Sequence, residues 1–551
     1  MAHSGIQIMQ INLHHSKSAS AILARSLAVM HTGIALVQEP WLVHKAIRGL
    51  GGCGNIYHVR SEEKPRTCII VKGLNATLLP QVSNGDITVI RLRLNLNDGG
   101  IRKMLLGSIY MPYDSPDPPP QPEVMKVTEL ARKEGLELLL GCDANCHHTG
   151  WGSTNINSRG ESLHEFLIST ELFILNRGTK PTFMDFRRQE VIDITISSQG
   201  LVDLVRDWRV SNEPSGSDHR LIRFSLQLKV ATTWTRNPRR TNWDGYRADL
   251  DATIKNIPTK FHTRKDLETS ALCLGNAITD AYEANCPLKP KTGSSRVPWW
   301  TPELAKLKTE TRKRFNKARN TGLAVHWEIY RSSQKEYSKA IVKAKRKSCR
   351  DFCGSIEETP EASRLCRILS SDHRTQLNCL QLPNGEFTSS ESHTLKHLLE
   401  THFPGFQETT PTTNCYSTGT GDSYKPRDWL LANKIAQPRD IEWAIKTFRP
   451  YKAPGPDGIF PALLQEGLNV LIGPLTKILR ASIALRHVPQ VWVNTKIVFI
   501  PKSGKNGHIR AKDFRPISLA SFLLKTLERL VDRYLRTGPL TLSLWLLHIC
   551  L

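Results

Sequence analysis

The ten residues LELLLGCDAN at positions 136–145 indicate the fold most clearly. The first five are almost all apolar and have the length of a buried strand. Asp143 and Asn145 come directly after them. Side chains two residues apart in an extended segment share a face, so both are expected on one side. The stretch predicts a strand that delivers a carboxylate and an amide to a sheet edge.

Three other segments place acidic or histidine side chains at expected strand ends. Glu39 follows an apolar run, Asp193 lies within another, and Asp218 and His219 precede a strand of alternating polarity. Cleaving a phosphodiester requires a hard cation, an activated water and stabilisation of developing negative charge. Each residue alone is more often a cap, a turn residue or half of a surface pair. Together they predict a metal-assisted phosphodiesterase.

Individual roles follow from the chemistry of each side chain. Glu39 is an oxygen ligand of the kind that Mg²⁺ prefers. Of Asp143 and Asn145, one can handle a proton or hold the water while the other donates to a phosphate oxygen. His219 is the only nearby group whose ordinary pKa is close to neutrality. Asp193 or Asp218 would hold its tautomer and support its charged form.

Residues 1–228 carry the signals of one α/β unit. Apolar stretches typical of strands alternate with amphipathic stretches such as 123–134, and Asp98 with Gly99 predicts a hairpin turn. This order suits two sheets packed together and covered by helices. Such an assembly places its loops along one rim, where we expect the site.

The order of polar residues along 5–228 resembles that of the endonuclease/exonuclease/phosphatase family. The residues concerned are Asn12, Glu39, Tyr110, Asp143, Asn145, Asp193, Asp218 and His219. The resemblance implies a four-layered α/β sandwich and Mg²⁺, with Mn²⁺ as a substitute. It implies Asn12 and Glu39 at the metal, and Asp218 as a second carboxylate beside the metal or the histidine.

The same resemblance implies the remaining roles. Tyr110 would contact the phosphate, while Asp143 and Asn145 would serve the attacking water and the transition state. Asp193 would orient His219. The amino-acid sequence of residues 143–163 and 181–196 is similar to that of non-LTR (LINE-type, jockey- or LOA-like) retrotransposon endonucleases.

Charge and cysteine usage limit the partners and the compartment. The chain has 75 Lys and Arg against 51 Asp and Glu, a net charge of +24. That surplus indicates a polyanion such as nucleic acid or, less specifically, an acidic membrane surface. Twelve cysteines without a regular framework indicate a reduced, intracellular protein that is not secreted. No membrane span and no obligate protein partner are expected.

Half of this surplus lies in a short segment. Residues 296–350 contain sixteen Lys and Arg and four Glu, and aromatic residues recur among them at helical spacing. One or two long basic helices are predicted here. The cluster Lys343, Lys345, Arg346 and Lys347 would contact phosphates. The alternative is a solvated face without a ligand.

Residues 440–537 resemble the beginning of a reverse transcriptase, its fingers. Lys502 and Arg515 match positions that meet the triphosphate of an incoming nucleotide. Polymerases need paired carboxylates for two Mg²⁺ ions, and after Arg515 the chain has only Glu528 and Asp532. The polymerase part is therefore expected to be incomplete and inactive. The expected domains are the endonuclease at 1–228, a linker and basic connector at 229–439, the fingers at 440–537 and an aberrant tail at 538–551.

The expected activity is a Mg²⁺-dependent nick in double-stranded DNA that leaves a 3′-hydroxyl as the primer for reverse transcription. Element RNA is a further candidate partner. The expected location is the nucleus, with a cytoplasmic ribonucleoprotein as an additional form. The alternative is a catalytically inactive remnant that binds nucleic acid. A repair-type abasic endonuclease is the third hypothesis. The retrotransposon-like sequence that follows Asp143 argues against it.

Overall fold

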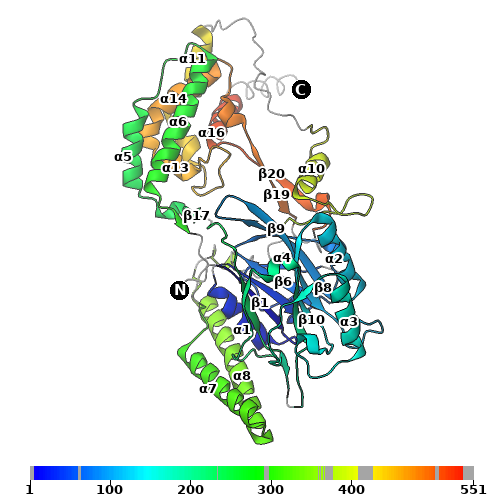
Figure 1. The fold of residues 1–551 in the computed structure, drawn as a ribbon. Coiled ribbons are helices and arrows are strands. Elements are labelled where there is room, and N and C mark those ends of the chain that lie inside the picture. The colour runs from blue at the N-terminus through cyan, green and yellow to red at the C-terminus, as the bar shows by residue number, and fades with distance from the viewer. Residues whose placement is uncertain are drawn as a thin grey trace, which may run out of the picture. The chain divides into compact units, whose positions relative to one another are not determined.

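The chain folds into two compact units, which are described separately (Figure 1). The amino-terminal unit comprises residues 1–232, 292–404 and 501–513, and the second unit comprises 233–291, 405–500 and 514–551. The computed structural model describes residues 5–537 apart from 31, 60–63, 186, 233, 291–296, 358, 360, 364, 366–376, 408–425 and 503–507. The tail expected at 538–551 lies outside the described residues.

Two six-stranded sheets form the centre of the amino-terminal unit. The first sheet has, in spatial order, β15 (Val205–Val210), β16 (Ile222–Leu226), β1 (Ile6–Asn12), β2 (Gly33–Gln38), β6 (Thr67–Lys72) and β5 (Asn55–Tyr57). The second has β11 (Phe173–Ile174), β14 (Asp193–Ser197), β10 (Glu137–Asp143), β9 (Ile101–Tyr110), β8 (Ile87–Asn95) and β7 (Asn75–Leu78). Short hairpins flank them, β3 (Leu42–Val43) with β4 (Ala46–Ile47) and β12 (Phe183–Met184) with β13 (Gln189–Glu190).

The sheets pack face to face, and helices cover their outer faces. Ile8 and Phe224 of the first sheet share one buried core with Leu106 and Leu139 of the second. Helix α1 (Lys17–Ala28) packs on the other face of the first sheet. Helices α2 (Pro122–Glu134) and α3 (Ser158–Ser169) pack on the other face of the second, and α4 (Gln199–Val202) is a short connection. The four-layered α/β sandwich is thereby confirmed.

Strand register brings the polar strand ends together. In the first sheet β1 runs parallel to β2, with Asn12 opposite Gln38, the residue before Glu39. In the second sheet Asp143 of β10 lies opposite Tyr110 of β9 on one side and opposite Asp193 of β14 on the other. Parallel neighbours end at the same edge, so these side chains reach one rim.

A hairpin of two long helices also belongs to the amino-terminal unit. Helix α7 (Pro302–Thr321) ends at Gly322, which takes the left-handed conformation, and α8 (Ala324–Gly354) follows. Tyr337 and Ile341 of α8 pack with Leu304 of α7 against Ala21 of α1. The prediction of long basic helices is confirmed, and there are two. Helix α10 (Glu391–His402) completes the unit.

The second unit is a helical core with small strand pairs. Its helices are α5 (Trp243–Ile254), α6 (Arg264–Asn285), α11 (Pro426–Ile435), α12 (Pro438–Lys446), α13 (Pro461–Glu466), α14 (Leu468–Ala484), α15 (Gln490–Val493) and α16 (Phe522–Thr537). Its strands are β17 (Trp234–Thr235), β18 (Lys289–Pro290), β19 (Lys496–Pro501) and β20 (Phe514–Leu519). Among the described residues of either unit, no helix is long and apolar enough to cross a membrane.

Residues 234–290, the first part of the expected linker and basic connector, fold as part of the second unit. Helix α6 alone has 22 residues, and a capping box formed by Thr263 and Asp266 begins it. The Tyr246 hydroxyl of α5 donates a 2.9 Å hydrogen bond to the Leu463 carbonyl. The apolar sequence pattern of α6 is weak because many of its buried residues are small, such as Ala271 and Ala277. Helix α11 likewise lies within the segment expected as linker and basic connector at 229–439.

Candidate active site

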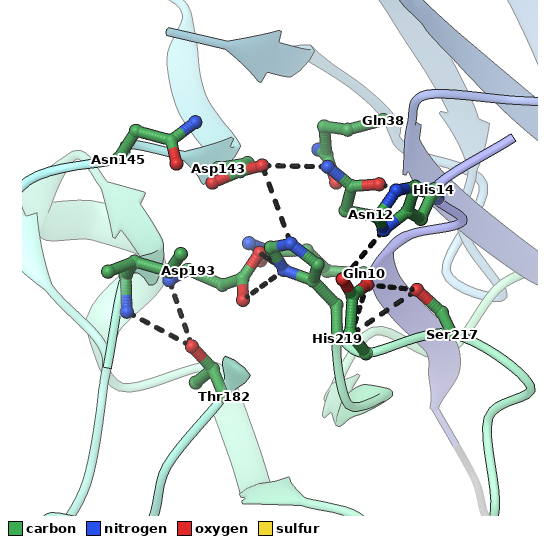
Figure 2. A network of polar contacts seen from close by, with 12 residues as sticks. Gln10, Asn12, His14, Gln38, Asp143, Asn145, Thr182, Asp193, Ser217 and His219 are labelled. Carbon is green, nitrogen blue, oxygen red and sulfur yellow. Dashed lines mark hydrogen bonds and ion pairs between the residues drawn. The ribbon is translucent and has the colours of Figure 1, made fainter. Parts of the chain in front are cut away.

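The strand-end residues of both sheets form one hydrogen-bonded network (Figure 2). Asp143 is 1% exposed, and its Oδ2 accepts a 2.7 Å hydrogen bond from Asn12 Nδ2 of the opposite sheet. Its Oδ1 is buried and has no hydrogen-bond partner among the described residues. Burial raises the pKa of Asp143 to about 7, since the opposing effect of His219 only partly offsets it. The pKa of this buried carboxyl group is thus close to neutral pH.

His219 lies between the two carboxylates of the second sheet. Its Nδ1 is 3.1 Å and 2.9 Å from the two Asp193 oxygens, and its Nε2 is 3.9 Å from Asp143 Oδ2. Burial alone would lower the pKa of His219, but Asp193 and Asp143 outweigh it and raise the pKa to about 10. The edge of the Phe183 ring lies against the imidazole, with centroids 5.1 Å apart. The ring is therefore held as an imidazolium.

Asp193 is itself held by the segment that precedes it in the sandwich. The Thr182 hydroxyl accepts hydrogen bonds from the backbone N–H groups of Ile192 (3.1 Å) and Asp193 (3.0 Å). The carboxylate of Asp193 contacts the imidazole directly. Of the two acids that the sequence allowed for this contact, Asp193 makes it.

Asp218 pairs with a different histidine. Its Oδ2 is 2.6 Å from His14 Nδ1, and Ser217 Oγ donates to its Oδ1 at 3.0 Å. Burial would raise the pKa of Asp218, but His14, His219 and Ser217 outweigh it and lower the pKa to about 2. The same contact raises the pKa of His14. Sequence reasoning missed His14, since its partner lies 204 residues away.

Glu39 and Tyr110 lie at the more open side of the site. Glu39 has a φ of 44° and a side chain 19% exposed, with His15 Nε2 at 3.6 Å from its Oε1. Burial raises the pKa of Tyr110, and Glu39 and Asp143 raise it further. The Arg66 guanidinium lies 5.0 Å from the centre of the Tyr110 ring. Tyr110 is therefore a neutral phenol that can donate a hydrogen bond.

Asn145 does not share an extended face with Asp143, contrary to the expectation. Strand β10 ends at Asp143, and Asn145 has a φ of 46°, in the left-handed region. Its Nδ2 donates a 3.1 Å hydrogen bond to the Met111 carbonyl. The turn, rather than strand alternation, determines the position of this amide.

Uncharged residues that sequence reasoning did not single out connect the sheets beneath the site. Gln10 of β1 donates from Nε2 to the carbonyls of Cys142 (3.2 Å) and Ile194 (3.0 Å), and its Oε1 accepts from Thr195 Oγ1 (2.8 Å). Gln38 of β2 donates to the Gly141 carbonyl at 2.9 Å. The available signal was a glutamine in, or at the end of, a strand that is otherwise largely apolar. These bonds hold the two sheets in a defined register.

Two groups of residues could be considered for a metal ion. Single ligand atoms of Asp143, Asp193 and His219 lie within 4.8 Å of one another. However, Asp193 occupies Nδ1 of His219, and a protonated imidazole offers no lone pair. The partnerless Oδ1 of Asp143 and the part-exposed carboxylate of Glu39 are oxygen donors. These two fit a hard cation better.

The predicted nucleic-acid contacts lie in different surroundings. Lys343, Arg346 and Lys347 are exposed on α8, whereas Lys345 lies 5.6 Å from the Trp299 ring centre and burial lowers its pKa. In the other predicted segment, Lys502 directly follows β19, and Arg515 is exposed on β20.

Comparison with known proteins identifies the amino-terminal unit. The model of a family described as endonuclease-reverse transcriptase matches residues 104–223, which include six of the eight residues predicted for the endonuclease site. This segment is therefore similar to endonuclease domains of the endonuclease–reverse transcriptase type. The resemblance drawn from the sequence motifs is confirmed.

Curated relatives of the chain come from retrotransposable elements. The Pol polyprotein of element R1 from Bradysia coprophila is 22% identical over 428 residues, 72% of this chain and 41% of the relative. A probable RNA-directed DNA polymerase from transposon BS of Drosophila melanogaster is 25% identical over 419 residues, 73% of this chain and 45% of the relative. The chain spans about half the length of the curated relatives it matches.

Solved structures similar to the chain cover about two fifths of its length. The endonuclease domain of TRAS1, a telomere-specific non-LTR retrotransposon, is 28% identical and covers 41% of this chain and 99% of its own, with a TM-score of 0.34. The catalytic domain of Xenopus laevis APE2 is 13% identical and covers 41% of this chain and 93% of its own, with a TM-score of 0.32.

Proposed function

We propose that the amino-terminal unit is a Mg²⁺-dependent endonuclease that nicks double-stranded DNA and leaves a 3′-hydroxyl. The observation that carries the proposal is the buried chain of contacts from Asp193 through His219 to Asp143 and Asn12. It places an imidazolium beside a carboxyl of near-neutral pKa at the rim of the sandwich. The pair supplies a base for the attacking water and a positive charge for the phosphate, both of which phosphodiester cleavage needs.

Each group at the rim has a task that follows from its charge. Asp143, being partly ionised near pH 7, takes the proton of the attacking water. His219 stays positive and stabilises the negative charge that grows on the phosphate. Asp193 holds its ring and its charge. Tyr110, as a neutral phenol, and Asn145, as an amide, donate hydrogen bonds to phosphate oxygens.

Of the oxygen donors Glu39 and Asp143, Glu39 would hold the cation, which leaves Asp143 free to take the proton of the water. Bound Mg²⁺, or Mn²⁺ in its place, neutralises charge on the scissile phosphate and on the leaving oxygen. Asn12 donates to Asp143 and accepts from the His14 backbone N–H at 2.7 Å, so it fixes the carboxylate beside the metal. Asp218, paired with His14, adds a second negative charge on the metal side.

The 3′-hydroxyl would serve as the primer for reverse transcription of element RNA, in the nucleus, where the target DNA lies. In the second unit Arg515, together with Lys502, would meet the triphosphate of a nucleotide. No paired aspartates follow these residues in the 551-residue chain. We therefore expect this chain by itself to give no primer extension on poly(rA)/oligo(dT) above a heat-killed control, and incorporation of dTTP would contradict that part of the proposal.

Plasmid nicking tests the endonuclease. The full chain should convert supercoiled plasmid to open circle with Mg²⁺ and not with EDTA. A DNA polymerase should then extend the nick without prior phosphatase treatment, because the 3′ end is a free hydroxyl. Asp143→Ala should lower the rate at least about a hundredfold. DNA binding without any nicking would favour the alternative, a catalytically inactive nucleic-acid-binding remnant.

A further inference from the structure

A row of positive side chains on α8 faces the beginning of α1 across an open groove of about 680 Å³. Helix α1 contributes Lys17 and the buried Ser18 to its wall. Helix α8 contributes a stripe of one helical face, which consists of Lys335, Lys339, Lys343, Arg346, Lys347 and Arg350. Residues at these three- and four-residue spacings lie side by side on a helix. The groove is therefore a continuous positive surface of the amino-terminal unit.

The basic residues of the groove differ from other cations of the hairpin in their ion pairing. Lys17 and the six basic residues of the α8 stripe have no ion pair with a carboxylate in the part of the chain that the structure describes. Other cations of the same hairpin are paired, since Lys308 and Arg312 of α7 contact Glu213 at 2.6 Å and 2.8 Å. Like charges at i and i+4 destabilise a helix. Such a stripe is stabilised when an anionic ligand lies along it.

Packing distinguishes this stripe from the rest of α8. Tyr337 and Ile341 are buried against α1, while Lys339, Lys343 and Lys347 stay exposed. Lys345, within the same basic cluster, lies over the Trp299 ring instead and does not line the groove. Tyr337 and Ile341 thus attach the hairpin to α1, and the basic side chains beside them line the groove. Figure 1 shows α8 running beside α1.

The groove begins beside the metal-side residue of the active site. Lys17 lies 4.9 Å from the ring centre of Trp41, which stands two residues after Glu39. His15, two residues before Lys17, reaches Glu39 at 3.6 Å. From Lys335 to Arg350 the helix rises about 22 Å. Along duplex DNA that length corresponds to roughly six phosphates of one strand.

We propose that this groove, made by α8 and the start of α1, binds the phosphate backbone of duplex DNA next to the nick. This inference rests on the proposed endonuclease function, and it assigns part of the DNA-binding surface to a helical hairpin outside the α/β sandwich. Duplex DNA is favoured over single-stranded RNA because the groove adjoins the residues proposed to cut DNA.

Salt-dependent binding by the full chain tests the groove. The combined substitutions Lys339→Gln, Lys343→Gln and Lys347→Gln should weaken binding of a labelled 30-base-pair duplex in EDTA at least about tenfold at 0.1 M salt. The slope of log K against log salt should flatten by about 2 to 3, since each lost contact removes about 0.9. The matched control removes the same charge from exposed residues elsewhere, Lys103→Gln, Lys126→Gln and Lys133→Gln, and should change the slope little.

Further measurements separate this inference from the proposed function. Lys345→Gln should leave the slope unchanged, and in nicking assays the groove variant should raise KM while kcat stays constant. An unchanged slope in the groove variant, or an equal loss in the control, would overturn the proposal, as would weaker binding of single-stranded RNA with unaltered binding of duplex DNA. Circular dichroism and melting should match the wild type. If the wild type never nicks, the proposed function fails, while binding in EDTA still decides the groove.

Discussion

Asp143 and Asp193 are direct partners across the antiparallel strands β10 and β14, and His219 contacts both. Two carboxylates that would repel one another are thus joined by one imidazolium in a buried space. The charge state of each depends on the others. Activity and stability should therefore both respond to changes at any one of the three.

Asp193→Asn should preserve the shape of the site and remove the charge that supports His219. The pKa of His219 should fall, and nicking should slow by roughly 100- to 10,000-fold, as for other residues that orient a catalytic histidine. NMR titration of the His219 ring nitrogens and plasmid nicking measure the two effects. Asp203→Asn, at an exposed position, is the control. An unchanged His219 titration would show that Asp193 has no such role.

Nicking should depend on pH with two limbs. The active form has Asp143 ionised, so the rate should rise with pH through about 7. It also has His219 protonated, so the rate should fall through about 10. Single-turnover rates between pH 5 and 10.5 measure both limbs. If the nicking rate of His219→Gln still falls at high pH in the same way, the fall belongs to another group.

Stability should follow the same charges with a definite sign. The pKa of folded His219 is raised to about 10 from an ordinary value of 6.5. The contribution of His219 to the free energy of unfolding is therefore fully present below pH 6.5 and is lost as the pH rises to about 10. The free energy of unfolding of the amino-terminal unit, from urea titration, should decline over this window. His219→Gln should decline less steeply, and equal slopes would contradict the linkage.

Glu39→Gln should raise the Mg²⁺ concentration needed for half-maximal nicking, because it removes a carboxylate from the cation. Saturating Mg²⁺ should restore part of the rate. Calorimetric titration of Mg²⁺ without DNA gives a readout independent of activity. Glu129→Gln, on the exposed face of α2, serves as the control. Equal Mg²⁺ dependence in the two variants would remove Glu39 from the metal site.

Leu274→Ala should destabilise the second unit by about 2–5 kcal/mol, since Leu274 of α6 is fully buried in its helical core. Leu272→Ala on the same helix should cost less than about 0.5 kcal/mol, because Leu272 is 49% exposed. Urea unfolding and limited proteolysis measure the difference. Similar losses in both variants would mean that α6 does not belong to this core.

The sequence by itself determined which residue types stand at the strand ends of the sandwich. Glu39 and Asp143 follow apolar runs and His219 precedes a strand, which places all three at sheet edges, because an ionisable side chain is costly in the middle of a buried strand. The sheet architecture followed from the same alternation. Short-range chemistry therefore predicted the fold class and the candidate site residues.

Only the tertiary structure decided which of these residues touch. The Asn12–Asp143 bond joins two sheets, and the His14–Asp218 pair joins residues 204 positions apart. Such contacts depend on strand register and on the packing of sheets, which no local pattern contains. The same reason separates Lys345 from Lys343 on one helix. Both belong to one basic run, but the neighbouring elements cover one side chain and leave the other exposed.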